Sequence, residues 1–179
     1  SGWYVLDAQN ADLIIDNVTF NNNYPYQSLI YLFKSNCLLY NLNILSNNYA
    51  TYWGSVSMIE IIKSNATLDG IIINNNFSGW LNGAMIKAEQ SPSFEEDSDV
   101  YLSNIIINGN HFAGTDYGAG NAIQIRLVNA YLNNIEISEN YYDYGSSIYL
   151  WDLFNHESIL KNITITKNIS NGISPGIVL

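Results

Sequence analysis

Two identical tripeptides carry the side chains best suited to acid–base chemistry in this sequence. They are Asp116-Tyr117-Gly118 and Asp143-Tyr144-Gly145, and His111 precedes the first of them. Two neighbouring carboxyl groups can act as acid and base on a glycosidic bond. Asp and Gly are also frequent turn formers, so both tripeptides can be turns without a catalytic role. Asp116, Asp143 and His111 therefore stay an alternative catalytic group, and the balance favours a protein that is not an enzyme.

Aromatic residues gather around these tripeptides and at equivalent points elsewhere in the chain. Exposed aromatic rings can stack on sugars, whereas rings that pack on one another close a corner of a fold and bury area. Both interpretations stay open, and a protein partner is a third, since aromatic residues are enriched at interfaces. The candidates for sugar stacking are Tyr52, Trp53, Trp80, Tyr117 and Tyr144.

The sequence predicts no metal site and no cofactor. An acidic segment with Glu95, Glu96, Asp97 and Asp99 has the oxygen ligands that calcium prefers, but it lacks the spacing of a calcium-binding loop. A solvated acidic loop is the alternative. Zinc spacings, phosphate-binding glycine loops and nucleophile elbows do not occur. The single cysteine, Cys37, falls at an inward position, which predicts a buried and inert thiol.

Composition narrows the class of partner. The net charge is −10 with 6 Lys+Arg, which disfavours nucleic acids and anionic membranes as partners. No apolar run approaches the roughly 20 residues that span a bilayer. Asparagine is unusually common, with 27 residues, so the surface is expected to be polar and nearly uncharged.

The elements that must position these side chains follow from an internal repeat. We number each repeat from one apolar residue, called position zero, which is first Ile15 and then recurs after 24, 29, 34, 30 and 28 residues. Apolar residues alternate with other residues on both sides of position zero. Alternation with a period of two indicates strands with one buried face. Position plus two is Asn or Gly, which predicts a left-handed bend, and position plus eight is always Asn. Position zero is occupied by Ile15, Leu39, Leu68, Leu102, Leu132 and Leu160.

The asparagines at plus eight predict a hydrogen-bonded ladder between stacked strands. They are Asn23, Asn47, Asn76, Asn110, Asn140 and Asn168. In this repeat the chain resembles the pectin-lyase-like superfamily. The resemblance implies an all-β fold, a single-stranded right-handed parallel β-helix of about six coils with an internal asparagine ladder, and it covers residues 1–179 as a single domain.

The enzymes of that superfamily suggest what a catalytic member should contain. Polygalacturonase-like hydrolases carry Asn-Thr-Asp, Asp-Asp, Gly-His-Gly and Arg-Ile-Lys segments, and none of these occurs here. Pectate-lyase-like enzymes need carboxylates near an Arg or Lys base. Around the only arginine strand, Ile125-Arg126-Leu127, we expect no carboxylate at the same phase on neighbouring coils.

Three Asn-x-Ser/Thr sites are expected at surface turns and are candidates for glycosylation, namely Asn17, Asn65 and Asn162. They fit an extracellular or cell-surface location. Similar strand patterns at both termini predict open ends, which can continue in flanking sequence or stack on other copies. We therefore expect a structural or adhesive surface protein that is a piece of a longer chain or a filament protomer. The alternative is a carbohydrate-binding or polysaccharide-cleaving module that uses the aromatic corner.

Overall fold

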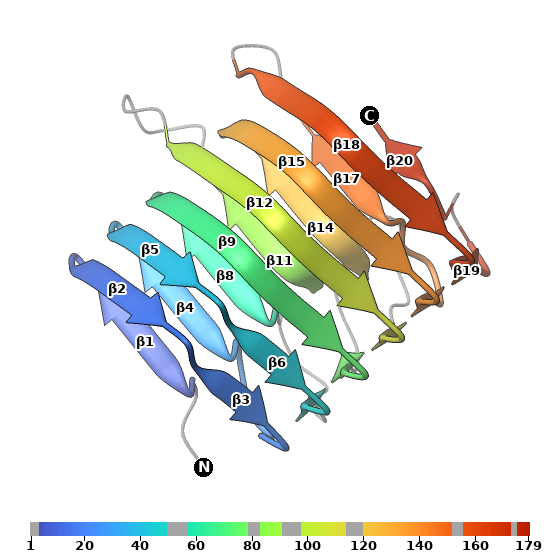
Figure 1. The fold of residues 1–179 in the computed structure, drawn as a ribbon, viewed down its shortest axis with the longest axis horizontal. Coiled ribbons are helices and arrows are strands. Elements are labelled where there is room, and N and C mark those ends of the chain that lie inside the picture. Colours follow the sequence, from blue (N-terminus) through green and yellow to red (C-terminus); the bar gives the residue numbers. More distant parts are fainter. Residues whose placement is uncertain are drawn as a thin grey trace.

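The computed structural model describes residues 4–49, 57–78, 83–90, 98–113, 120–151, 156–172 and 175–179. Within these ranges the chain is all-β and has no helix. Its strands form three parallel sheets in which the strand order follows the order in the sequence (Figure 1). Stacked parallel strands of this kind are compatible with a β-helix solenoid, as the sequence repeat predicts.

Sheet A has seven strands that recur along the chain and is the fainter layer behind in Figure 1. Every strand pairs in parallel with the equivalent strand of the next repeat, for example Ile30 with Ile59. Its strands are β1 (Leu6–Gln9), β4 (Ile30–Phe33), β8 (Ile59–Ile62), β11 (Ala84–Glu89), β14 (Asn121–Arg126), β17 (Ile148–Trp151) and β20 (Ile177–Val178).

Sheet B forms the layer in front and holds position zero. Its strands are β2 (Asp12–Asp16), β3 (Thr19–Asn21), β5 (Asn36–Tyr40), β6 (Asn43–Leu45), β9 (Asn65–Asn74), β12 (Asp99–Asn108), β15 (Asn129–Ser138) and β18 (Ser158–Thr166). Sheet C connects the ends of sheet B to sheet A. Its two-residue strands are β7 (Asn48–Tyr49), β10 (Phe77–Ser78), β13 (His111–Phe112), β16 (Tyr141–Tyr142) and β19 (Ile169–Ser170).

The register confirms the repeat that the sequence predicts. All six residues at position zero lie beside one another in sheet B, from Ile15 opposite Leu39 to Leu132 opposite Leu160. Inward residues at this position are almost fully buried in the middle of the stack, and Leu68 and Leu102 are completely so. Each buried aliphatic side chain contributes roughly 1.5–3 kcal/mol. The hydrophobic core therefore lies between the three sheets.

The predicted left-handed bends are also present. Every residue at position plus two has a positive φ between 52° and 68°, which only glycine and, less readily, asparagine adopt at low cost. Gly70 is the one glycine of this set, and an added Cβ would lie 2.9 Å from Asn41 Oδ1. The other members are Asn17, Asn41, Asn104, Asn134 and Asn162.

The asparagines at plus eight form a continuous hydrogen-bonded series, called here the asparagine column. Each side-chain amide donates to the carbonyl oxygen of the next asparagine over 2.9–3.0 Å. The same oxygen accepts the backbone N–H of the preceding asparagine. The column contains Asn23, Asn47, Asn76, Asn110, Asn140 and Asn168.

Two strands of sheet A, β11 and β17, do not keep the offset from position zero that β1, β4, β8 and β14 share. In most repeats the inward residues of sheet A stand nine and seven positions before position zero, as Ile59 and Ile61 do before Leu68. In the fourth repeat they are Ile86 and Ala88, because the segment between β11 and β12 is longer. This shift matters for the site described next.

Among the described residues no helix is long and apolar enough to cross a membrane.

Candidate functional site

Among the described residues, four charged side chains linked by ion pairs lie on the outer face of sheet A. Strands alternate, so Ile59 and Ile61 point into the core while Glu60 points away from it. Lys87 occupies the same row on β11, and Glu89 and Arg126 share the neighbouring row on β11 and β14. These four side chains, Glu60, Lys87, Glu89 and Arg126, are called the charged strip.

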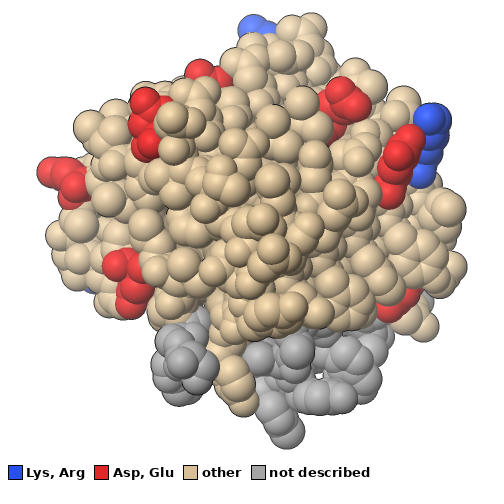
Figure 2. Space-filling model, turned by 60° about the horizontal axis from the view of Figure 1, so that its bottom comes forward, with Lys and Arg blue, Asp and Glu red and all other residues tan. Residues whose placement is uncertain are grey.

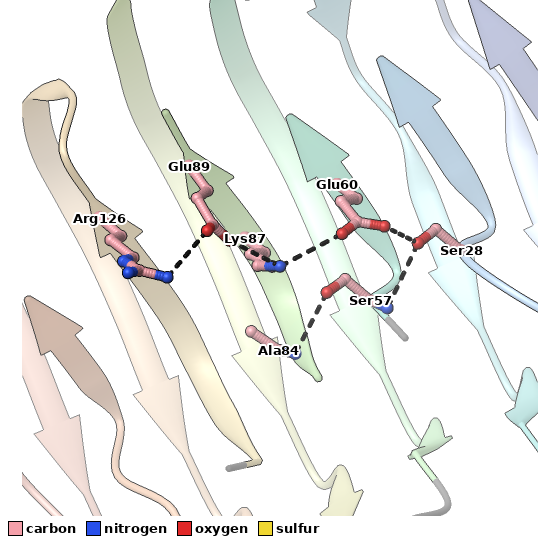
Figure 3. Close-up of polar contacts among 7 residues, drawn as sticks. All are labelled: Ser28, Ser57, Glu60, Ala84, Lys87, Glu89 and Arg126. Carbon is pink, nitrogen blue, oxygen red and sulfur yellow. Dashed lines mark hydrogen bonds and ion pairs between the residues drawn. The ribbon is translucent and has the colours of Figure 1, made fainter. Parts of the chain in front are cut away.

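The charged strip is joined by short polar contacts (Figure 3). Lys87 Nζ lies 3.3 Å from Glu60 Oε1 and 2.8 Å from Glu89 Oε2. Arg126 Nη1 donates to Glu89 Oε1 over 3.0 Å. At the other end, the Ser28 hydroxyl donates to Glu60 Oε2 over 2.5 Å. Two carboxylates and two cations therefore balance in charge along one line across neighbouring strands.

Burial makes these contacts stronger than ordinary surface ion pairs. The side chains of Lys87 and Glu60 are only 10% and 12% exposed, whereas those of Glu89 and Arg126 are 24% and 31% exposed. Exposed pairs contribute about 0–1 kcal/mol, but breaking a buried pair leaves a charge without compensation. Lys87 lies between the carboxylates of Glu60 and Glu89, so its loss would leave both of them without their shared cation.

Aromatic rings flank the charged strip on both sides. Beyond Glu60, the ring of Tyr31 stacks on Tyr4 at 4.7 Å and lies 6.3 Å from Phe33. Beyond Arg126, the guanidinium lies 4.4 Å from the ring of Trp151, which is half exposed. Cation–π contacts of this kind fix both partners. The outer face of sheet A is therefore a row that runs from aromatic through charged to aromatic groups.

The flanking tyrosines stay protonated in neutral solution. Burial, followed by the nearby charge of Glu60, raises the pKa of Tyr4. Burial also raises the pKa of Tyr31, with smaller contributions from Tyr4 and Glu60. Neutral phenols keep their rings available for stacking and their hydroxyls available as donors.

Two polar atoms beside the charged strip have no hydrogen-bond partner among the described residues. They are Gln124 Oε1, in the row of Glu60 and Lys87, and Arg126 Nε. Buried polar atoms are normally paired, so such atoms are where a polar ligand gains most. They supply one acceptor and one donor next to Trp151.

The prediction that Arg126 has no carboxylate beside it is wrong. Arg126 is directly opposite Glu89 in the register of β14 and β11, and their side chains are in contact. The error came from the fourth repeat, whose sheet A strand does not stand at the usual offset from Leu102. Counting forward from the asparagine column does not find this strand either, because the first inward residue of sheet A stands between 7 and 13 residues after the preceding asparagine, as in Asn23 to Ile30 and Asn110 to Ile123.

The acid–base group expected from the tripeptides is described only in part. Asp143 follows β16, and its Oδ1 lies 3.7 Å from Nε2 of His111 on β13. The imidazole is held between Phe77 and Tyr141, which meet it edge on at 5.0 and 4.9 Å. Asp116 lies outside the described residues. The described geometry therefore brings Asp143 to a histidine, and the predicted pair of carboxylates stays a prediction.

The aromatic corner is partly self-packed. Phe112 and Tyr142 are buried and stack at 4.7 Å, and burial raises the pKa of Tyr142. Of the candidates for sugar stacking, Tyr144 is exposed at the surface. The other four lie outside the described residues and stay predictions: Tyr52, Trp53, Trp80 and Tyr117.

The remaining candidates from the sequence lie on the outer surface or in the core. Asn17, Asn65 and Asn162 are exposed. Cys37 is buried, and burial raises its pKa to about 11, with a smaller contribution from Asp12. Asp99, the described member of the acidic segment, accepts a hydrogen bond from Asn129 Nδ2 over 2.9 Å. Within the described ranges no three His, Cys, Asp or Glu side chains group as metal ligands.

Comparison with known proteins adds no family to these observations. No protein-family model matches the chain, and no curated protein matches it significantly.

Proposed function

We propose that this protein is a non-catalytic, adhesive protein of the cell surface or extracellular space that binds glycans along the outer face of sheet A. The supporting observation is the charged strip between two groups of rings. Aromatic faces stack on sugar rings, and paired carboxylates and cations hydrogen-bond to hydroxyl groups. Four strand steps separate Tyr31 from Trp151, about 19 Å at the usual strand spacing, which suits an extended chain of sugars.

The same contacts argue for binding and against cleavage. An acid–base pair needs one carboxyl group that can hold a proton and another that is free to act as base or nucleophile. Glu89 is neutralised by both Lys87 and Arg126, and Glu60 by Lys87 and the Ser28 hydroxyl. Neither carboxylate is left to perform such a step. The cations are likewise engaged, so the row offers a nearly neutral surface.

We place this surface on a right-handed parallel β-helix of about six coils, similar to the pectin-lyase-like superfamily, with the asparagine column as its internal ladder. The regular register of sheets A, B and C and the continuous series from Asn23 to Asn168 support this proposal. An experimental structure of the chain tests it, and a left-handed path or an interrupted asparagine series would contradict it.

A glycan array followed by titration of the best ligand tests the binding proposal. Trp151→Ala and Arg126→Ala should each weaken binding at least tenfold. Tyr131→Ala, a matched change on the outer face of sheet B, should leave it unchanged. A reducing-sugar assay on the same glycans should show no cleavage. Binding that survives Trp151→Ala and Arg126→Ala, or cleavage abolished by Asp143→Asn, would replace this proposal with the aromatic-corner alternative.

We further propose that copies of the chain associate head to tail through the edges of sheet B. At one edge Leu13 and Val18 are only partly buried, and at the other Leu160 and Ile163 are. The two ends of the asparagine column are also complementary. Among the described residues, Asn168 Nδ2 donates to Ile137 O alone, and Asn23 Oδ1 accepts no hydrogen bond from another asparagine. Sedimentation of the 179-residue chain tests this: concentration-dependent oligomers that Leu160→Lys abolishes support it, and a monomer at all concentrations refutes it.

A further inference from the structure

The outer face of sheet B has a hollow of about 320 Å³ that lies apart from the charged strip. Its apolar surface comes from Ile14, Leu38 and Tyr101, which are 70%, 37% and 44% exposed. Asn65 and Thr67 line the same hollow, and they belong to one Asn-Ala-Thr glycosylation site. A modification site and an exposed apolar depression therefore coincide.

We propose that Asn65 carries an N-linked glycan whose first sugar ring lies in this hollow against the free face of Tyr101. The inference rests on the extracellular location given under the proposed function. In the reaction, Asn65 Nδ2 forms a bond to C1 of a sugar and loses a proton. The bond from C1 to the pyrophosphate of a polyprenyl-linked oligosaccharide donor breaks, and the lipid pyrophosphate leaves.

The hydrogen bonds of Asn65 are compatible with this bond. Its Oδ1 accepts the backbone N–H of Asp99 over 2.9 Å, and its Nδ2 donates to Asn36 Oδ1 over 3.3 Å. A glycosylated amide keeps its carbonyl oxygen and one N–H. Both contacts can therefore persist, and they hold the linkage at the rim of the hollow.

Tyr101 presents one face to a ligand because its other face is occupied. The ring stacks on Tyr131 at 4.7 Å with an interplanar angle of 10°. Tyr131 does not line the hollow, so the pair is a two-ring platform with its open side toward Ile14 and Leu38. Apolar and aromatic faces of this kind suit the C–H face of a sugar ring.

Charge indicates which kind of sugar fits. Two carboxylates, Asp12 and Asp99, line the hollow, and no Lys or Arg side chain does. An acidic sugar would be repelled, whereas a neutral N-acetylated sugar would not. Figure 2 shows that basic side chains are also sparse on the face of the molecule that it draws, where they lie at the margins.

The other glycosylation sites lack this combination. Asn76 is buried, and its Nδ2 already donates to Ile44 O, Asn74 O and Asn110 Oδ1 within 3.0 Å. Asn168 begins a further Asn-x-Ser motif, and its Nδ2 donates to Ile137 O while its Oδ1 accepts from Asn140 Nδ2. A sugar at Asn76 or Asn168 would break the asparagine column. Asn17 and Asn162 are exposed but do not line the hollow. Asn65 is therefore the site where an attached sugar also gains a contact surface.

The test is expression of the chain through the secretory pathway of a eukaryotic cell, with glycopeptide mass spectrometry of the purified protein. Asn65 should be occupied in the original chain and in Thr67→Ser, which keeps the acceptor motif. Thr67→Val removes the motif at nearly constant volume and should leave Asn65 bare. Occupancy of Asn17 or Asn162 without Asn65 would overturn the inference and leave the proposed location intact. A secreted chain with all three sites bare would overturn the inference as well, whereas glycan binding by the charged strip would still be judged by the array.

Contact with Tyr101 is tested by a double-mutant cycle on the secreted proteins. The original chain and Thr67→Val are compared with and without Tyr101→Ala, and bacterial material corrects for the threonine change itself. The glycan should favour the folded state by about 2- to 10-fold when Tyr101 is present, the size of one ring contact, and should have no effect in Tyr101→Ala. Tyr24→Ala, at an exposed tyrosine that does not line the hollow, is the control and should retain the glycan effect. An equal effect in Tyr101→Ala would place the sugar outside the hollow.

Discussion

Replacing Asn110 by alanine should remove a large share of the stability of this fold. Asn110 is fully buried in the middle of the asparagine column. Its Nδ2 donates to Ile73 O and Asn140 Oδ1, both over 2.9 Å, and its Oδ1 accepts from Asn76 N and Asn76 Nδ2. Alanine deletes these four bonds, together with a fifth from Nδ2 to Asn108 O over 3.0 Å, and leaves several of the partners buried without a replacement.

The expected loss follows from these bonds. A buried hydrogen bond contributes about 1 kcal/mol net, and an orphaned partner can cost 1–3 kcal/mol. The sum is about 4 kcal/mol or more, against a total of about 5–15 kcal/mol for an ordinary domain. For a chain of this length that corresponds to a fall in Tm of about 10 °C.

Equilibrium unfolding in urea, followed by far-ultraviolet circular dichroism, measures this loss. The matched control is Asn133→Ala, since Asn133 is exposed and accepts one bond, from Asn162 Nδ2 over 3.0 Å. The control should lose less than about 0.5 kcal/mol. If Asn110→Ala came within about 1 kcal/mol of Asn133→Ala, the column would not stabilise the stack and the reasoning would fail.

Three further predictions concern single sites. Lys87→Met should destabilise the chain by about 2–4 kcal/mol in urea unfolding, because it removes the cation that Glu60 and Glu89 share. Arg126→Met, at the more exposed end of the charged strip, should cost less. Equal losses in the two variants would contradict this order. Gly70→Ala should cost at least about 1 kcal/mol, since φ is +68° and the new Cβ meets Asn41 Oδ1, and an unchanged Tm would refute the strain. The pKa of Cys37 is raised to about 11, so the native thiol should resist alkylation at pH 8.5 and react fully in urea. Stability should also fall as pH rises from about 9 to 11, because the unfolded thiol ionises first, and Cys37→Ala should lose this pH dependence.

The sequence alone predicts the parts of the fold that stand at the same distance from position zero in every repeat. Position zero, the positive φ at plus two and the alternation around them all follow from local chemistry at each repeat. Leu102, for example, is flanked by Val100 and Ile105, which are buried as alternation and the bend at Asn104 require. Such features need no knowledge of the partner strand, because every repeat makes the same choice.

The charged strip could not be found in the same way because it depends on register across loops of different length. Glu60 and Lys87 are 27 residues apart, while Glu89 and Arg126 are 37 apart. A fixed offset from position zero finds β8 and β14, which carry Glu60 and Arg126, but it misses β11, which carries both Lys87 and Glu89. A positive φ also recurs directly before every member of the asparagine column, but the residue types there vary too much to mark the turn in the sequence: Asn22, Ser46, Asn75, Gly109, Glu139 and Lys167.

In a stack of parallel strands, a change in loop length and a change in strand length have different effects on the outer surface. A longer loop leaves every row in place, since equivalent residues still meet their neighbours at the strand spacing. One residue inserted within a strand exchanges the inward and outward faces. In β11 such a slip would carry Lys87 into the core and leave Glu60 and Glu89 without their cation. Strand phase is therefore held by the core and by the charged strip together, so the outer rows of sheets A and B keep their geometry when a loop changes length.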